Sequence, residues 1–116
     1  MNKNRDVTMY FDDIIKYCGR IMRTLSKINL DEFRKSEDAQ DSVIRRFEVI
    51  GEAVKNIPDE IKKQYPKIPW KDAAGFRDFL IHDYPEVVID RVYITGTQHL
   101  PQFKKQIEVV LKNLTK

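Results

Sequence analysis

The sequence predicts an all-α fold, an up-and-down bundle of four to five helices that forms a single domain over residues 1–116. Three observations predict it. Apolar residues recur in alternating steps of three and four along most of the chain, which is the spacing of a helix with one buried face. No segment alternates apolar and polar residues as a half-buried strand does. A length of 116 residues with 34% charged residues suits one compact domain of amphipathic helices, since domains cluster near about 100 to 150 residues.

The first two predicted helices carry the clearest patterns. The first is expected from about Arg5 to Ile28, and its apolar seam is Val7, Phe11, Ile14, Cys18, Ile21, Leu25 and Ile28. Ser36 can cap a second helix, because its side-chain oxygen can accept a hydrogen bond from an unpaired backbone N–H of the first turn. This second helix repeats the spacing at Val43, Phe47, Ile50, Val54 and Ile57. We therefore expect it to pack antiparallel to the first.

Prolines divide the middle of the chain. Pro58 is expected to end the second helix and to start a short helical turn through Ile61, and Pro66 and Pro69 predict a turn-rich connector. A third helix is expected from Trp70 to about Asp83. It should end near Tyr84, because the proline that follows biases this residue away from helical angles.

Two further helices complete the prediction. One begins at Pro85, where a proline suits the first helical position, and Gly96 is expected to end it. The chain then restarts as a last helix at Pro101. Its apolar face is Leu100, Phe103, Ile107, Val110 and Leu114.

Composition excludes several classes of protein. The single cysteine, Cys18, cannot form an intrachain disulfide, and residues 1–13 are charged where a secretory signal would be apolar. The longest aliphatic runs, such as residues 87–89, have three residues and are far too short to cross a membrane. We therefore expect a cytoplasmic protein with no membrane partner. Paired Cys or His residues at metal-binding spacing and Gly-rich phosphate loops are both absent from the sequence, so no metal and no cofactor are predicted.

The segment from Arg77 to Tyr84 concentrates side chains that can carry chemistry. The imidazole of His82 can exchange a proton with a ribose hydroxyl, and the guanidinium of Arg77 can bind a phosphate and the charge that develops on it. Asp78 lies one helical turn before the histidine and can orient it, and the phenol of Tyr84 can position the phosphate or accept a modification. Arg77 and His82 diverge by about 140° around an ideal helix. A two-fold dimer would bring the patches of two copies together.

Residues 77–84 also resemble the Arg-x4-His-x-Tyr motif of HEPN-domain toxins, specifically the HepT-like ribonucleases that pair with a minimal nucleotidyltransferase antitoxin. The flanking segments resemble the same family in the expected order. They are residues 43–54 (VIRRFEVIGEAV), 68–70 (IPW), 80–84 (LIHDY) and 99–101 (HLP). The resemblance thus covers nearly the whole chain.

The resemblance implies a HEPN fold and a type VII-like toxin that cleaves RNA as a metal-independent endoribonuclease. Arg77 and His82 match the catalytic pair, which lies in a cleft between the two subunits of a homodimer. Asp78 occupies the supporting polar position, and Tyr84 matches the tyrosine that the antitoxin adenylylates. The implied partners are an RNA substrate and the nucleotidyltransferase antitoxin, with larger hetero-oligomers open. His99 stands where the family is more often acidic, and we leave it outside the site.

Other interpretations stay open. The chain could be a non-catalytic accessory subunit that presents a substrate to a separate nucleotidyltransferase, or a structural adaptor that dimerises through its long helices. For Cys18, a buried small apolar residue is favoured over a reactive thiol. Trp70 is expected to anchor the core or a dimer interface instead of stacking on a base.

Overall fold

The computed structural model describes residues 3–76 and 85–116, and this part of the chain is helical with no strand. The elements are α1 (Lys3–Leu25), α2 (Leu30–Lys35), α3 (Glu37–Lys55), α4 (Asp59–Gln64), α5 (Trp70–Ala74), α7 (Pro85–Ile94), the π-helical turn η1 (Thr95–His99) and α8 (Leu100–Leu114). The predicted all-α bundle is confirmed. Within the described residues, no helix is long and apolar enough to cross a membrane.

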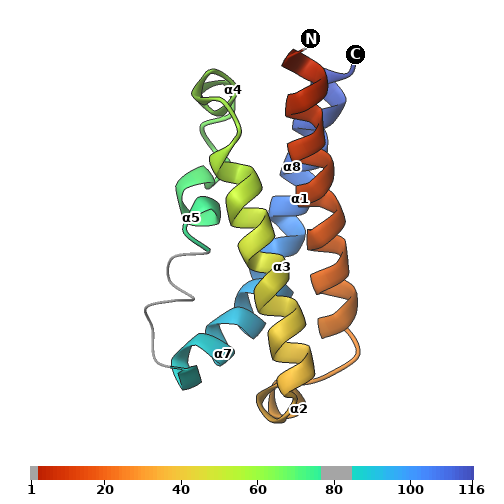
Figure 1. Ribbon diagram of the computed structural model, residues 1–116, viewed down its shortest axis with the longest axis vertical. Coiled ribbons are helices and arrows are strands. Elements are labelled where there is room, and N and C mark those ends of the chain that lie inside the picture. The colour runs from red at the N-terminus through yellow and green to blue at the C-terminus, as the bar shows by residue number, and fades with distance from the viewer. Residues whose placement is uncertain (1–2, 77–84) are drawn as a thin grey trace.

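Three long helices form the centre of the fold. α3 and α8 both pack against α1 and run antiparallel to it, so that the two ends of the chain lie together in Figure 1. The predicted apolar seams face the core. Fully or almost fully buried are Phe11, Ile14, Cys18, Ile21 and Leu25 of α1, Val43, Phe47, Ile50 and Val54 of α3 with Ile57 after it, and Leu100, Phe103, Ile107 and Val110 of α8.

The turn between the first two long helices contains a helix that the sequence analysis missed. α2 has six residues and begins with a capping box, in which the Asn29 side chain accepts from the Glu32 backbone N–H and the Glu32 carboxylate accepts from the Asn29 backbone N–H. Phe33 is its buried residue. The predicted cap at the start of α3 is present, because the Ser36 Oγ accepts a hydrogen bond from the Ala39 backbone N–H at 3.2 Å.

The third predicted helix differs from the structure. A continuous helix was expected from Trp70 to about Asp83, but α5 ends at Ala74 and the chain turns at Gly75. The backbone N–H of Gly75 bonds to the Lys71 carbonyl, which closes the last turn. Glycine is a weak residue for a helix interior because it loses the most conformational freedom on folding. Half of the predicted third helix, residues 77–83, lies outside the described residues.

The predicted helix end at Gly96 is wrong. α7 continues through η1 into α8, and the Leu100 backbone N–H bonds to the Thr95 carbonyl, five residues back. Pro101 has no backbone N–H to donate to a helical carbonyl. A widened turn before such a proline keeps the helix continuous. Gly96 has another role, because a Cβ atom there would lie 2.5 Å from Leu25 Cδ1 and 3.2 Å from Ile21 Cγ2 of α1.

Gly96→Ala is therefore expected to lower the free energy of unfolding by about 1–3 kcal/mol, the typical cost of overpacking a core. Gly19→Ala is the matched control, because its added methyl group would meet only Lys104 Cε at 3.8 Å. This control should be neutral or stabilising by up to about 1 kcal/mol, since alanine is the better helix residue. Urea unfolding of both variants measures the difference. Equal stabilities would show that α1 does not restrict this position.

Candidate functional site

The residues predicted to carry catalysis, Arg77, Asp78, His82 and Tyr84, lie outside the described residues. The structure describes the helices on both sides of this segment, residues 77–84, which we call the motif segment. These helices are α5 before it and α7 after it, and Figure 1 shows both on the side of the bundle away from α1.

The chain before the motif segment is fixed to the core by aromatic side chains. Trp70, at the start of α5, is 8% exposed, and its indole N–H donates to the Tyr65 carbonyl at 3.0 Å. Its ring meets Phe11 of α1 edge-on, with centroids 6.4 Å apart. Phe76 meets Phe47 of α3 in the same way at 5.0 Å. The prediction that Trp70 anchors the core is confirmed.

The chain after the motif segment is fixed to α2. The Phe33 and Tyr93 rings lie 5.6 Å apart, and the Tyr93 hydroxyl donates to the Ile28 carbonyl at 2.9 Å. Arg34 donates from Nε and Nη2 to the two carboxylate oxygens of Asp90, each at 2.8 Å. This paired geometry fixes orientation as well as distance. The rotation of α7 about its axis is therefore set by side chains far away in the sequence.

The Arg34 and Asp90 pair also shifts both ionisation equilibria. The hydrogen bonds from the guanidinium lower the pKa of the Asp90 carboxyl below its ordinary value. The same hydrogen bonds, with the charge of Asp90, raise the pKa of Arg34. Because the pKa of Asp90 is depressed, the pair stabilises the fold above the ordinary range of a carboxyl group, and this contribution is lost as the pH falls through the lowered pKa. The connection is therefore intact near neutral pH.

A pocket of about 320 Å³ opens between the α5 region and the part of the chain where η1 meets α8. Asp72 and Phe76 line it from one side, and Thr95 and His99 line it from η1. Turns with π-helical geometry occur often at functional sites. His99, which the sequence analysis left outside the site, is thus exposed on a pocket at the border of the motif segment.

A second pocket, of about 350 Å³, shares part of this lining and adds two cationic side chains. Lys71 comes from α5 and Arg91 from α7. Both are exposed, and with the Asp72 carboxylate in the same lining the pocket keeps one net positive charge, which favours an anionic ligand beside the motif segment. The sequence analysis did not single out either residue. They are twenty positions apart, so only the fold brings them to one pocket.

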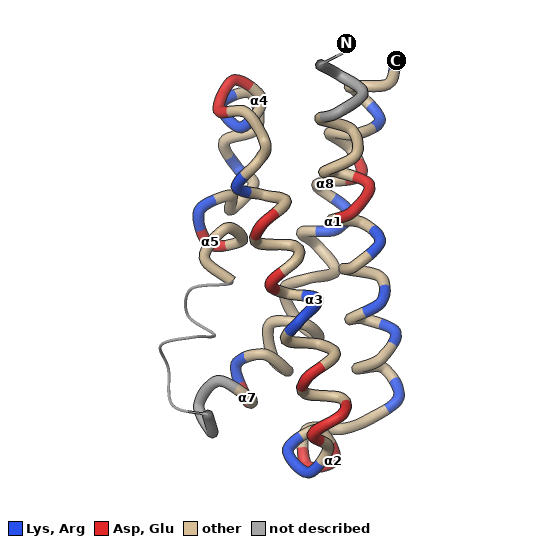
Figure 2. The backbone as a smooth tube through the Cα atoms, in the orientation of Figure 1, with Lys and Arg blue, Asp and Glu red and all other residues tan. Residues whose placement is uncertain are grey.

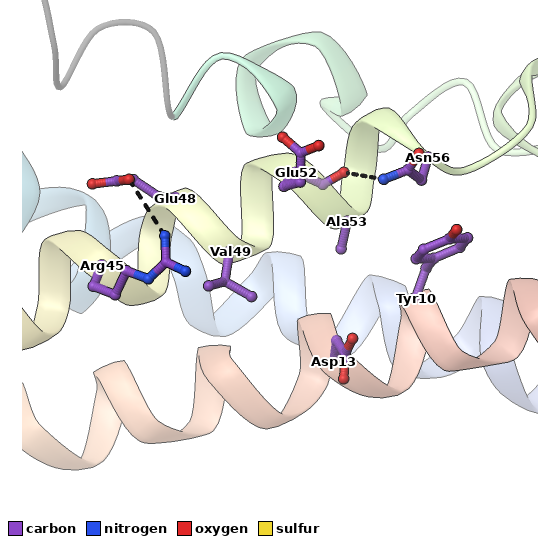
Figure 3. Close-up of a pocket in the computed structure, with 8 residues that line it drawn as sticks. All are labelled: Tyr10, Asp13, Arg45, Glu48, Val49, Glu52, Ala53 and Asn56. Atoms are coloured by element: carbon purple, nitrogen blue, oxygen red, sulfur yellow. Dashed lines mark hydrogen bonds and ion pairs between the residues drawn. The ribbon is translucent and has the colours of Figure 1, made fainter.

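A third and larger pocket, of about 510 Å³, has the opposite character. It lies between α1 and α3, and Figure 3 shows Tyr10 and Asp13 on one helix and the remaining lining residues on the other. Asp13, Glu48 and Glu52 give it three carboxylates, and the single arginine, Arg45, lies 3.7 Å from Glu48. Such a lining repels a phosphate backbone.

Two other predicted features can be placed. Cys18 is fully buried, and this burial raises the pKa of its thiol to about 12. It therefore stays protonated near neutral pH, which confirms the prediction of an unreactive apolar residue. Across residues 3–76 and 85–116, no group of three or more His, Cys, Asp or Glu residues could hold a metal ion.

The fold and the sequence together define an all-helical protein in which an Arg-x4-His-x-Tyr motif lies in the chain between two anchored helices. The chain belongs to the ribonuclease HepT-like family, whose model matches residues 14–110. Two Methanocaldococcus jannaschii proteins named "Putative RNase" are 40% and 38% identical over 110 residues. These alignments cover 95% of this chain in both cases, and 95% and 91% of those proteins.

A third relative carries the name of the family. A Thermococcus cleftensis protein named "Probable ribonuclease HepT" is 36% identical over 103 residues, which cover 89% of this chain and 94% of that protein. No solved structure matches the chain. The resemblance noted from the motifs is therefore confirmed as family membership over most of the chain.

Proposed function

We propose that this protein is the toxin of a HEPN and nucleotidyltransferase toxin–antitoxin pair, and that it cleaves RNA in the cytoplasm without a metal ion. One observation carries the proposal: the family match runs from residue 14 to residue 110 and so includes the whole Arg-x4-His-x-Tyr motif. Names of relatives that describe ribonucleases support the same activity. The cationic pocket beside the motif segment is compatible with an RNA phosphate.

In the proposed reaction, His82 takes the proton from a ribose 2′-hydroxyl and the 2′-oxygen attacks the adjacent phosphorus. The bond from phosphorus to the 5′-oxygen breaks, leaving a cyclic phosphate, and a protonated imidazole supplies the proton to the leaving oxygen. Arg77 binds the phosphate and stabilises the negative charge that develops on it. The need for a 2′-hydroxyl selects RNA over DNA.

The proposed active form is a homodimer. Arg77 and His82 diverge on one ideal helix, and a two-fold axis would place the arginine of one copy near the histidine of the other. Asp78 would orient the imidazole. A mixture of Arg77→Ala and His82→Ala subunits, each inactive alone, should then regain cleavage on exchange of subunits. Failure to regain activity in verified mixed dimers would oppose a site shared between the copies.

Cleavage of labelled RNA by purified, unmodified protein in excess EDTA tests the proposed activity. Products with cyclic phosphate ends are expected, and intact mass should first exclude adenylate on the protein. Intact RNA after incubation with folded, unmodified dimer would favour the accessory subunit of a two-component nucleotidyltransferase.

Tyr84→Phe is expected to keep cleavage activity and to escape neutralisation by the nucleotidyltransferase. Adenylate at this hydroxyl would place negative charge and bulk beside the motif, and the charge would repel the RNA backbone. The measurement is RNA cleavage after incubation with the partner enzyme and ATP. Tyr10→Phe is the matched control, because Tyr10 lies on the separate pocket between α1 and α3 and should still permit neutralisation.

The position of the adenylate gives an independent readout. Peptide mass spectrometry should place it on Tyr84. Adenylate found only on Tyr10, Tyr17, Tyr65 or Tyr93 would contradict the assignment.

A further inference from the structure

The outer face of α1 carries a row of cations that the motif does not use. The row consists of Lys16, Arg20, Arg23 and Lys27, and we call it the α1 basic row. The steps of four and three residues keep Lys16, Arg20 and Arg23 within about 60° of one another on α1, on the side opposite the buried seam, and Lys27 follows in the turn after the helix. Figure 2 shows the row along the outer edge of α1.

The α1 basic row accounts for the net positive charge of the chain. The formal net charge of the chain is +3, so without these four cations the remaining residues carry a net −1. Within the described residues, none of the four forms an ion pair with a carboxylate, whereas Arg34, Arg45 and Lys104 do. Three of the four are exposed, and only Arg20 is half-buried.

Helix stability does not account for the row. Like charges three or four residues apart destabilise a helix by about 0.2–0.5 kcal/mol for each pair. Cations near the last turn interact favourably with the helix dipole, but this explains only Arg23 and Lys27. Lys16 and Arg20 lie nearer the middle of α1, before its last turn. They are held instead above the Tyr17 ring, at 5.7 and 5.2 Å from its centroid.

The spacing and the single sign of the row fit a polyanion. Lys16 and Arg23 are about 10 Å apart along the helix axis with Arg20 between them, and Lys27 follows in the turn just after the helix. A nucleic acid presents one negative charge per nucleotide, so such a row can neutralise several successive phosphates. A membrane surface is disfavoured, because amphipathic helices bind it through a free apolar face, whereas that face of α1 is buried against α3 and α8.

We infer that the α1 basic row is a second RNA-binding surface that holds the phosphate backbone away from the place of cleavage. This inference rests on the proposed function, because it concerns the same RNA substrate. The row lies on the side of the bundle opposite α5 and α7, and the bundle is 26 to 27 Å across. An RNA that contacts the row and the motif of the same copy must span this width. The inferred substrate class is therefore a long or folded RNA, not an oligonucleotide of a few residues.

The test compares two triple variants with equal loss of charge. Lys16→Gln/Arg23→Gln/Lys27→Gln removes the exposed part of the row and leaves Arg20 on the Tyr17 ring. Lys63→Gln/Lys67→Gln/Lys105→Gln removes three exposed lysines elsewhere and is the matched control. Since all six positions are exposed, both variants should fold, and circular dichroism checks this.

Binding is measured by fluorescence anisotropy with a labelled 40-nucleotide RNA at several salt concentrations, with His82→Ala in every protein to prevent cleavage. The row variant should bind at least about tenfold more weakly at low salt, and its slope of log K against log salt should fall by about 2, since each phosphate contact contributes about 0.7 for a single strand. The control should change much less. Equal affinity and slope for the row variant and its parent would overturn the inference.

A cleavage assay separates this inference from the proposed function. With an intact His82, the row variant should cleave the long RNA more slowly than its parent at subsaturating concentrations but cleave a hexanucleotide at an equal rate. RNA binding that depends on the row, without cleavage by the parent protein, would refute the ribonuclease and leave the binding surface supported. Binding of the row to phosphatidylserine vesicles in preference to RNA would overturn the inference.

Discussion

Replacing His82 with alanine is expected to reduce RNA cleavage by about 10²- to 10⁴-fold, which is the usual contribution of a positioned acid or base. In the proposed reaction this imidazole moves the proton of the attacking hydroxyl, and alanine has no group that can do so. The measurement is the initial rate of cleavage of a labelled RNA in EDTA. The variant should keep the helix content and the dimer of the parent, so the loss belongs to the chemical step.

The chain offers a direct comparison, because it contains only one other histidine. His99→Ala removes the same side chain from the pocket that borders the motif segment. A large loss in His82→Ala alone would assign the chemistry to the motif. A comparable loss in both variants would bring His99 into the site. An active His82→Ala protein would refute the assignment of the motif histidine.

The long helices could be predicted because their apolar seams repeat over many turns. α2 could not be predicted from periodicity, since its six residues give too few repeats. The sequence signal for this helix is the capping box of Asn29 and Glu32. At Gly96 the sequence does give a signal, but the signal predicts the wrong role. The sequence shows a glycine where a helix often ends, but only the structure shows that Leu25 and Ile21 exclude a side chain there.

The candidate site likewise has one part that can be predicted from the sequence and one part that only the fold shows. Arg77, His82 and Tyr84 are predicted from the eight-residue motif together with the resemblance of its flanking segments to the family. The contacts that position its flanks are not local. Arg34 and Asp90 are 56 residues apart in the sequence. Many other pairs of exposed acidic and basic residues would be equally plausible partners from the sequence alone. The sequence therefore identifies chemical groups, and the fold identifies what holds the neighbouring helices.

Phe47→Ala is expected to lower the free energy of unfolding by about 3–5 kcal/mol, the typical cost of truncating a buried aromatic residue. Phe47 is 1% exposed and lies at the centre of α3. Its ring meets Phe76 at 5.0 Å and lies 3.8 Å from the position of a Cβ at Gly96. Since a domain of this size is stable by only about 5–15 kcal/mol, the loss should be visible in urea unfolding. Val109→Ala, at a residue 55% exposed, should change stability by less than about 0.5 kcal/mol.

The same residue connects the core to the candidate site, and a double-mutant cycle can measure this connection. Phe47→Leu and Phe76→Leu, alone and together, should give a coupling energy of about 0.5–1.5 kcal/mol for the aromatic pair. Phe76 directly precedes Arg77 in the chain and packs on Phe47, so Phe76→Leu should also slow cleavage while most of the stability is retained. Additive stabilities with unchanged cleavage would mean that the aromatic pair fills the core and does not position the motif.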